Sequence, residues 1–197
     1  KAAESASSVP VVNAGDGNGE HPTQALLDLY TIYEKFGRLE NLTGVLAGDP
    51  LNSRTIHSLI DGLSLYENNT FYLLSPRELQ LSRNDLSKFT KKGIKIIEIN
   101  SEKDMPKNAD FWYWTRVQKE RFQDVDAYEK VKDSFYLTTK LVKEYAGKDT
   151  ILMDPLPRVG KIDITVDEDP RALYLRSQIR NGMYVRMALL KLILENK

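Results

Sequence analysis

Short apolar runs alternate along the chain with longer segments in which apolar residues recur every three or four positions. The first pattern is typical of strands and the second is typical of helices. The predicted strands are residues 11–12, 42–47, 71–74, 94–99, 111–114, 135–137 and 151–153. The predicted helices are residues 22–36, 53–65, 78–89, 125–132, 140–145 and 181–194. This alternation predicts an α/β fold, in which helices flank a doubly wound, mainly parallel sheet.

Two of the predicted helices, residues 22–36 and 181–194, carry apolar residues around most of their circumference. A helix of this kind is buried on several sides. Both helices could lie at the centre of one domain, or both could bridge to a second domain that is missing or supplied by another chain. The start of the chain favours the second interpretation, because it leaves no room for strands that would pair with residues 11–12.

Composition excludes several classes of function. Lys plus Arg and Asp plus Glu both total 28, so nothing indicates a nucleic acid or an anionic membrane surface as a partner. The absence of cysteine excludes disulfides and thiolate metal sites, and it fits a cytoplasmic location. His21 and His57 are too far apart in sequence to indicate a His-rich metal site. We find no signal peptide and no apolar run long enough to cross a bilayer.

The segment at residues 115–122 is rich in side chains that bind anions. It follows the apolar strand 111–114 directly and includes Arg116, Gln118 and Arg121. In an open α/β sheet, ligands bind at the carboxyl edge of the strands, and a guanidinium matches a carboxylate through two hydrogen bonds. The segment therefore indicates either a site for a small anionic substrate or a solvated charged turn.

Five motifs follow one another along the chain. They are NAGDG (13–17) with HPTQALLD (21–28), GD (48–49) with RTIHSL (54–59), TRVQKERF (115–122), PLPRV (155–159) and NGMYVRMALL (181–190). In this order they resemble aspartate carbamoyltransferase, over the C-terminal two thirds of such an enzyme. The resemblance implies that residues 1–21 are the tail of the carbamoyl-phosphate domain, that residues 22–176 form the aspartate-binding domain, and that residues 177–197 are a helix that returns to the first domain.

The activity that this resemblance implies belongs to pyrimidine biosynthesis. The carbamoyl group of carbamoyl phosphate passes to the amine of L-aspartate, giving N-carbamoyl-L-aspartate and phosphate. The family uses no cofactor, metal or covalent intermediate, so catalysis depends on placing two anions together and stabilising the charge that develops. The implied partners are L-aspartate, carbamoyl phosphate, the missing carbamoyl-phosphate domain, a homotrimer and a possible regulatory chain.

The resemblance also assigns roles to residues. His21 would donate to the carbonyl oxygen of carbamoyl phosphate as the catalytic residue, and Gln24 would bind its amino group. Arg54 would bind the α-carboxylate of aspartate, whereas Arg116 would bind the β-carboxylate with Gln118 orienting it. The first two lie at a loop-to-helix junction, where free backbone amides favour an anion.

Each of these roles has a structural alternative. His21 could instead cap the helix that follows it. Pro155, Leu156 and Pro157 would contribute backbone carbonyls that accept from the reactants, or they could form a stiff loop after a strand. His57 is expected to be a packed or surface histidine inside a helix. Ion pairs that tie the loops together are expected of Lys119, Glu120, Arg121 and Arg158.

Parts of the family pattern are missing or altered. The phosphate loop of the first domain would precede Lys1, and a lysine loop normally comes from a neighbouring subunit, so we expect this chain to bind carbamoyl phosphate very weakly. Residues 50–53 (PLNS) replace Leu-Lys-Tyr-Gly, which removes a lysine, and residues 177–180 (SQIR) replace a Gln- and Ala-rich stretch. Asp154 replaces a histidine, and a carboxylate there should repel the substrates unless a basic residue pairs with it.

Three functions compete. The chain could be the aspartate domain of an aspartate carbamoyltransferase, or a non-catalytic homologue that acts as a binding or scaffold subunit. Asp154 and the altered loop favour the second, whereas the intact anion-binding residues favour the first. Ornithine carbamoyltransferase is a third possibility, but that branch carries a cysteine in its His-Cys-Leu-Pro turn, and this chain has none.

Overall fold

The computed structural model describes residues 5–17, 19–119, 122, 125–131, 134–158 and 160–195. A five-stranded parallel sheet in the order β3-β2-β1-β4-β5 forms its centre. The strands are β1 (Thr43–Ala47), β2 (Thr70–Leu74), β3 (Lys95–Ile99), β4 (Phe111–Trp114) and β5 (Ile151–Met153). The α-helices are α2 (Pro22–Phe36), α3 (Arg54–Leu63), α4 (Arg83–Lys91), α5 (Val125–Val131), α6 (Thr139–Tyr145) and α7 (Ser177–Glu195). The predicted α/β fold with a parallel, doubly wound sheet is confirmed.

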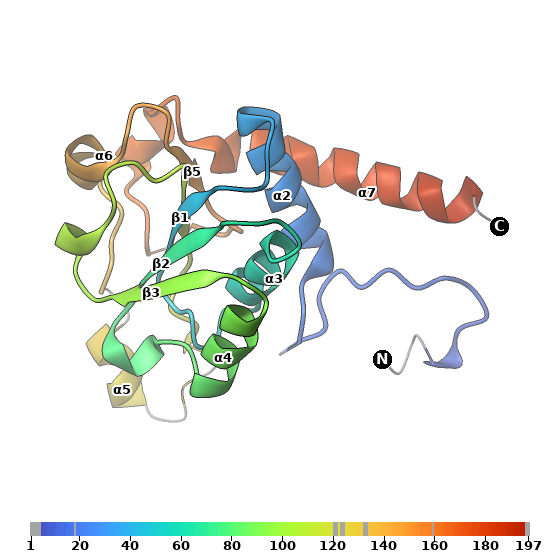
Figure 1. The fold of residues 1–197 in the computed structure, drawn as a ribbon, viewed down its shortest axis with the longest axis horizontal. Coiled ribbons are helices and arrows are strands. Elements are labelled where there is room, and N and C mark those ends of the chain that lie inside the picture. The colour runs from blue at the N-terminus through green and yellow to red at the C-terminus, as the bar shows by residue number, and fades with distance from the viewer. Residues whose placement is uncertain are drawn as a thin grey trace.

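Helices and irregular segments cover the two faces of the sheet (Figure 1), and an apolar core lies on each face. One face packs against α2, α3 and α4, with Ile32, Leu59 and Phe89 among its buried residues. The other face packs against α6 and the irregular segment before α7, through residues such as Val142 and Tyr174. Strands covered on both faces read as continuous apolar runs, as β4 does with its sequence Phe-Trp-Tyr-Trp.

The order of the strands defines one switch point in the sheet, where the direction of strand addition reverses. From β1 the chain moves outward through β2 and β3, then returns to the other side of β1 with β4 and β5. The two directions separate between β1 and β4, and ligands bind at such a switch point, outside the carboxyl ends of the strands. The segments that begin at Gly48 and Thr115 lie there.

Three sequence predictions of secondary structure are wrong in detail. The helix predicted at residues 78–89 is split into a 3-10 turn, Arg77–Leu79, and α4, because the Ser82 hydroxyl caps a new helix by accepting from the Asp85 amide. Residues 135–137 form only a single bridge, between Leu137 and Ile162. Residues 11–12 form no strand, and they pair with none of the five strands of the sheet.

The last helix, α7, is longer than predicted and is buried only near its start, at Gln178, Asn181 and Gly182. It packs against α2, and Figure 1 shows it crossing α2 and then projecting beyond the body of the molecule. The prediction that it is buried on several sides is wrong for this chain, because Met183, Met187 and five further large apolar residues of α7 are exposed. These are Ile179, Tyr184, Leu190, Leu192 and Leu194. Within the described residues, none of the helices has the length and hydropathy that a bilayer span requires.

Candidate functional site

The loops after β1 and β4 meet at the switch point and brace each other. A Cβ added to Gly48 would lie 2.1 Å from the Thr115 carbonyl oxygen, and the φ of Gly48 is 114°, so only glycine fits here. The Thr115 hydroxyl donates to the Ala47 carbonyl and accepts from the Asp49 amide. The Asp49 carboxylate in turn accepts from the Gln118 amide at 3.3 Å. Gln118 is therefore held by the opposite loop.

Arg54 is the first residue of α3, the helix that follows the loop after β1. Ser53 caps the helix by accepting from the Ile56 amide, which fixes the direction in which the helix leaves the loop. The Arg54 guanidinium donates to the Gly17 carbonyl at 3.0 Å. A Cβ on Gly15 would lie 3.2 Å from the same guanidinium, so the loop before α2 closes over Arg54.

The turn after β5 forms the third wall. Its Leu156–Pro157 peptide bond is cis, and Leu156 has a φ of 57°. The Asp154 carboxylate accepts from the Leu156 amide, so the side chain at the end of the strand holds the turn that follows it. This agrees with the stiff loop that the two prolines predict, and the loop also faces a cavity.

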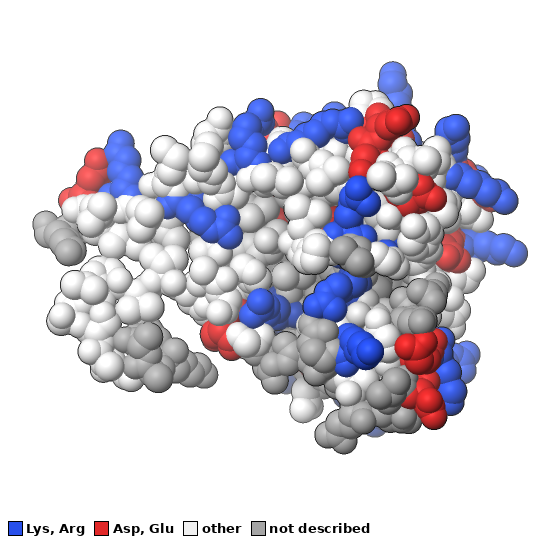
Figure 2. All heavy atoms as spheres, turned by 180° about the vertical axis from the view of Figure 1, so that it is seen from behind, with Lys and Arg blue, Asp and Glu red and all other residues white. Residues whose placement is uncertain are grey.

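One pocket of about 240 Å³ brings these segments together. Seven of the eight residues predicted for the site line it, namely His21, Arg54, Arg116, Gln118, Pro155, Leu156 and Pro157. Ser53, Thr55, Thr115 and Lys161 complete the lining. The guanidinium-bearing residues of two different elements therefore border a single cavity, whose size suits a small molecule. Figure 2 shows Lys and Arg side chains gathered around the middle of one face of the molecule.

His21 precedes α2 but does not cap it through its side chain. Its amide donates to the Ser58 hydroxyl at 3.0 Å, and its ring Nδ1 is buried without a hydrogen-bond partner among the described residues. Burial lowers the pKa of the imidazole, and the nearby cations Arg54 and Arg186 lower it further. A neutral imidazole carries one N–H donor, and it can donate to a carbonyl oxygen at neutral pH. The alternative role as a capping side chain is wrong.

Gln24 is the predicted residue that lies outside this pocket. Its side-chain amide donates to the Asp28 carboxylate at 3.0 Å, one helical turn further along α2. It lines a smaller cavity of about 50 Å³ beside Asp154 and Gln178. Because the amide nitrogen is held by Asp28, the amide oxygen is left to face a donor such as an NH₂ group.

Comparison with known proteins identifies the family. The family model described as "Aspartate/ornithine carbamoyltransferase, Asp/Orn binding domain" matches residues 40–193. The chain belongs to this family. The companion model, described as the carbamoyl-P binding domain, matches residues 1–34.

The proteins similar to this chain include catalytic subunits of aspartate carbamoyltransferase. The Methanocaldococcus jannaschii aspartate carbamoyltransferase catalytic subunit is 46% identical over 96% of this chain and 61% of its own length. Its solved structure has a TM-score of 0.89 at 43% identity and covers 100% of this chain and 63% of its own. The Trypanosoma cruzi aspartate transcarbamoylase in complex with aspartate and phosphate has a TM-score of 0.80 at 36% identity, covering 95% of this chain and 58% of its own. The chain thus spans about three fifths of the length of these relatives.

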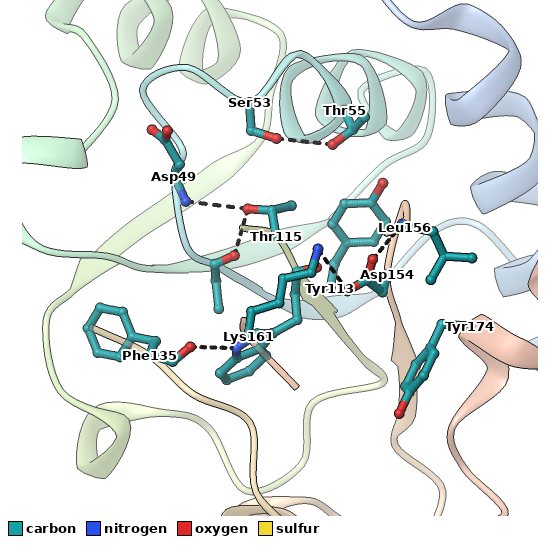
Figure 3. A network of polar contacts seen from close by, with 12 residues as sticks. Asp49, Ser53, Thr55, Tyr113, Thr115, Phe135, Asp154, Leu156, Lys161 and Tyr174 are labelled. Carbon is teal, nitrogen blue, oxygen red and sulfur yellow. Dashed lines mark hydrogen bonds and ion pairs between the residues drawn. The ribbon is translucent and has the colours of Figure 1, made fainter. Parts of the chain in front are cut away.

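A basic partner accounts for the carboxylate at residue 154. The carboxylate is paired with the ammonium of Lys161 at 2.8 Å, and both side chains are almost fully buried (Figure 3). Burial raises the pKa of Asp154, whereas the charge of Lys161 opposes that change. The basic partner that the sequence analysis required is present, so the repulsion expected from Asp154 is compensated.

A buried polar network behind the pocket was not anticipated from sequence. Asp28 accepts from Gln24, from the Gln178 amide at 2.7 Å and from the Tyr113 hydroxyl at 2.8 Å. Burial raises its pKa to about 7, and the three hydrogen bonds only partly oppose this. The available signal was its spacing, since Asp28 follows Gln24 by four residues on one face of a helix. Lys161 carried no such signal, because its partner Asp154 is recognisable only in the folded chain.

The remaining predictions concern loop contacts. Arg158 forms the predicted ion pair, with Asp167 at 2.6 Å. His57 is packed as predicted, edge-on to Phe89, and its ring Nε2 lies 2.7 Å from the Pro50 carbonyl oxygen. Lys119 places its ammonium 5.8 Å from the centre of the Tyr128 ring. Glu120 and Arg121 lie outside the described residues.

Proposed function

We propose that this chain supplies the aspartate site of an aspartate carbamoyltransferase, which transfers the carbamoyl group of carbamoyl phosphate to the amine of L-aspartate. The observation that carries the proposal is the single pocket bordered by both Arg54 and Arg116. L-aspartate carries two carboxylates, and two guanidinium groups on rigid elements can bind one each. The Trypanosoma cruzi relative has been solved in complex with aspartate and, separately, with carbamoyl phosphate, which supports both substrates.

In this proposal Arg54 binds the α-carboxylate and Arg116 binds the β-carboxylate, which Gln118 orients. His21, neutral at physiological pH, donates to the carbonyl oxygen of carbamoyl phosphate as negative charge develops there. The free amide oxygen of Gln24 accepts from the carbamoyl NH₂ group. The carbonyls of Pro155, Leu156 and Pro157 accept from the amine and amide hydrogens of the two reactants.

The proposal includes a division of the chain into domains. In it, residues 22–176 are the aspartate-binding domain, residues 1–21 are the tail of the carbamoyl-phosphate domain, and residues 177–197 return to that domain. The exposed apolar side chains of α7 give the missing domain a surface to cover. A homotrimer, a regulatory chain and a cytoplasmic location belong to the proposal as well, by analogy with the family. The alternative of a non-catalytic scaffold loses one of its arguments, because Asp154 is neutralised by Lys161.

Substitution of Arg116 tests the proposed aspartate site. When the carbamoyl-phosphate domain is supplied, Arg116→Ala should raise the KM for L-aspartate by an amount equivalent to about 2–3 kcal/mol, because it removes a charge-assisted contact. The dissociation constant of carbamoyl phosphate should change little. Lys119→Ala, four residues from the start of the same loop, is the matched control and should leave both constants near those of the unsubstituted enzyme. An equal loss for both substrates would contradict the role of Arg116.

The activity of the chain by itself is a second test. Without residues that complete the carbamoyl-phosphate site, the 197-residue chain should release no phosphate from carbamoyl phosphate and L-aspartate. Mixing it with a carbamoyl-phosphate domain should restore carbamoyl-aspartate formation, measured by a colorimetric ureido assay. Robust turnover by the 197-residue chain alone would overturn the division of the site between domains, and no turnover after reconstitution would favour the scaffold function.

A further inference from the structure

Lys161 borders the proposed aspartate pocket without belonging to any of the sequence motifs. It lies beyond the turn at residues 154–158, and its side chain is only 5% exposed. Together with Thr115, Arg116 and Pro157, it lines both the 240 Å³ pocket and a neighbouring pocket of about 380 Å³. These four residues form the wall between the two cavities. Lys161 is therefore a buried cation at the Arg116 end of the site.

The contacts of Lys161 fix the position of its ammonium. The group lies 2.8 Å from the Asp154 carboxylate (Figure 3) and 3.4 Å from the Trp114 carbonyl oxygen. A lysine ammonium has three N–H donors. One contact is an ion pair and the other is a hydrogen bond, so these two contacts do not use all three donors, and Lys161 lines the pocket in which a ligand would lie. Asp154 is itself held, since its amide donates to Gln178 and its carboxylate accepts from Leu156.

The balance of charges around this wall indicates what that ligand carries. Lys161 and Arg116 place two cations on this wall, beside the carboxylate of Asp154. Burial lowers the pKa of Lys161, Asp154 opposes that change, and Arg116 lowers the pKa further. Burying a charge is costly unless an opposite charge compensates it, so this wall favours a negatively charged ligand group such as a carboxylate.

We infer that Lys161 is a second cation for the side-chain carboxylate of the substrate, that it binds this group together with Arg116, and that Asp154 is the positioning residue that holds it there. This inference rests on the proposed function, because it concerns the aspartate site. It assigns to the Asp154–Lys161 pair a role in substrate binding in addition to its role in the fold. If the pair served only the fold, its removal would affect the binding of charged and neutral ligands equally.

A double substitution separates these two roles. Asp154→Asn/Lys161→Met removes both charges together and keeps an oxygen at residue 154 to accept from the Leu156 amide. It avoids the unpaired buried charge that either single change would leave. The matched control is Arg158→Met/Asp167→Asn, which removes the other ion pair of the same segment; Arg158 and Asp167 do not line the pocket. The ¹⁵N-¹H spectrum of each labelled chain reports whether it is folded.

L-Aspartate and L-asparagine are then titrated into the labelled 197-residue chains, and dissociation constants are taken from the chemical-shift changes. L-Asparagine replaces the side-chain carboxylate by a neutral amide of the same shape. We expect the Asp154→Asn/Lys161→Met chain to bind L-aspartate about tenfold more weakly than the unsubstituted chain, as loss of a charge-assisted hydrogen bond requires. Binding of L-asparagine should change by less than about threefold, and the control chain should bind both ligands as the unsubstituted chain does.

Each other outcome counts against a specific statement. If the folded double variant binds L-aspartate as tightly as the unsubstituted chain, the pair is structural only and the inference is overturned while the proposed function stands. Equal weakening for L-aspartate and L-asparagine also overturns it, because the effect would not follow the carboxylate. If the unsubstituted chain shows no shifts with L-aspartate, the proposed aspartate site itself fails, and the inference fails with it.

Discussion

Two buried carboxylates behind the pocket are stabilised in different ways. Asp154 has a cation as its partner, the ammonium of Lys161, whereas Asp28 is surrounded by the neutral donors Gln24, Gln178 and Tyr113. Burial raises the pKa of both groups, to about 7 for Asp28. Three neutral donors thus do not keep the pKa of this fully buried carboxyl group low, and it stays close to neutral pH. A lysine partner instead lets a charge persist next to a site for anions.

Removal of the cation from the paired carboxylate should have the largest effect on stability. Lys161→Met leaves Asp154 buried without its counter-charge, and breaking such a pair costs about 3–5 kcal/mol. Urea unfolding at pH 8 measures the loss. Asp154→Asn/Lys161→Met should recover most of it, because no buried charge remains. The deficit of the single variant should shrink at pH 5, where Asp154 can take up a proton; a loss that is equal at both pH values would contradict this account.

The carboxylate with neutral donors should control how stability depends on pH. The pKa of Asp28 is about 7 in the folded chain and near 3.8 in the unfolded chain, so between these values the folded state binds the extra proton. The free energy of unfolding should therefore fall as pH rises, by about 1.4 kcal/mol per pH unit from this group, or about 3 kcal/mol between pH 5 and 7. The stabilisation that comes from protonated Asp28 is complete below pH 4 and is lost above pH 7.

Asp28→Asn isolates this effect, because asparagine does not titrate. The difference in free energy of unfolding between the Asp28→Asn and unsubstituted chains should change with pH over this range and be constant above it. Urea unfolding at half-unit steps from pH 5 to 8 provides the measurement. Parallel curves for the two chains would mean that Asp28 remains charged in the folded state throughout.

Gln178 joins the two carboxylates, and its loss should affect both at once. Its amide nitrogen donates to Asp28 and its amide oxygen accepts from the Asp154 backbone amide. Gln178→Ala leaves a buried donor and a buried acceptor without this partner, which should cost about 2 kcal/mol in urea unfolding. The exposed neighbour Ile179 is the control, since Ile179→Ala should change stability by less than about 0.5 kcal/mol. Equal effects of the two changes would show that the link contributes nothing.

Much of the fold could be predicted from sequence because local and global signals agree. The apolar runs 111–114 and 151–153 coincide with β4 and β5, since a strand covered on both faces needs an apolar residue at every position. The helix at residues 78–89 was predicted as one unit because Ser82 and Asp85 were not recognised as a capping signal. The exposure of α7 fits the interpretation that this helix bridges to a second domain, but its apolar pattern alone is equally typical of a helix at the centre of one domain.

The candidate site divides in the same way. Residues carried by motifs, such as Arg54 and Arg116, were predicted and line one pocket. Lys161 was missed, since its role depends on a partner seven residues away across a cis turn. Asp28 was within a motif, but only its burial by Tyr113 and Gln178 makes its carboxyl group unusual. Contacts between segments that are distant in the sequence determine the surroundings of Lys161 and Asp28. Such contacts cannot be inferred from a single sequence.

A third carboxylate extends the comparison to the surface and should give the smallest effect. Asp61 pairs with Lys88 at 2.6 Å and Lys92 at 2.5 Å, and both lysine side chains are more than 40% exposed. Burial by itself would raise the pKa of Asp61, but the two lysines outweigh it and lower the pKa. Water already solvates these charges, so Asp61→Asn should cost less than about 1 kcal/mol in urea unfolding at pH 7.

The pH dependence at Asp61 should have the opposite sign to that at Asp28. Because the folded pKa of Asp61 is lowered, its stabilising contribution is present above the unfolded pKa, near 3.8, and is lost as pH falls through the folded value. The Asp61→Asn chain should therefore approach the stability of the unsubstituted chain below pH 4, and 1 M salt should narrow the gap at pH 7 by screening the pair. A loss at pH 7 as large as that of Lys161→Met would contradict the view that burial, rather than the number of partners, determines what a carboxylate contributes in this chain.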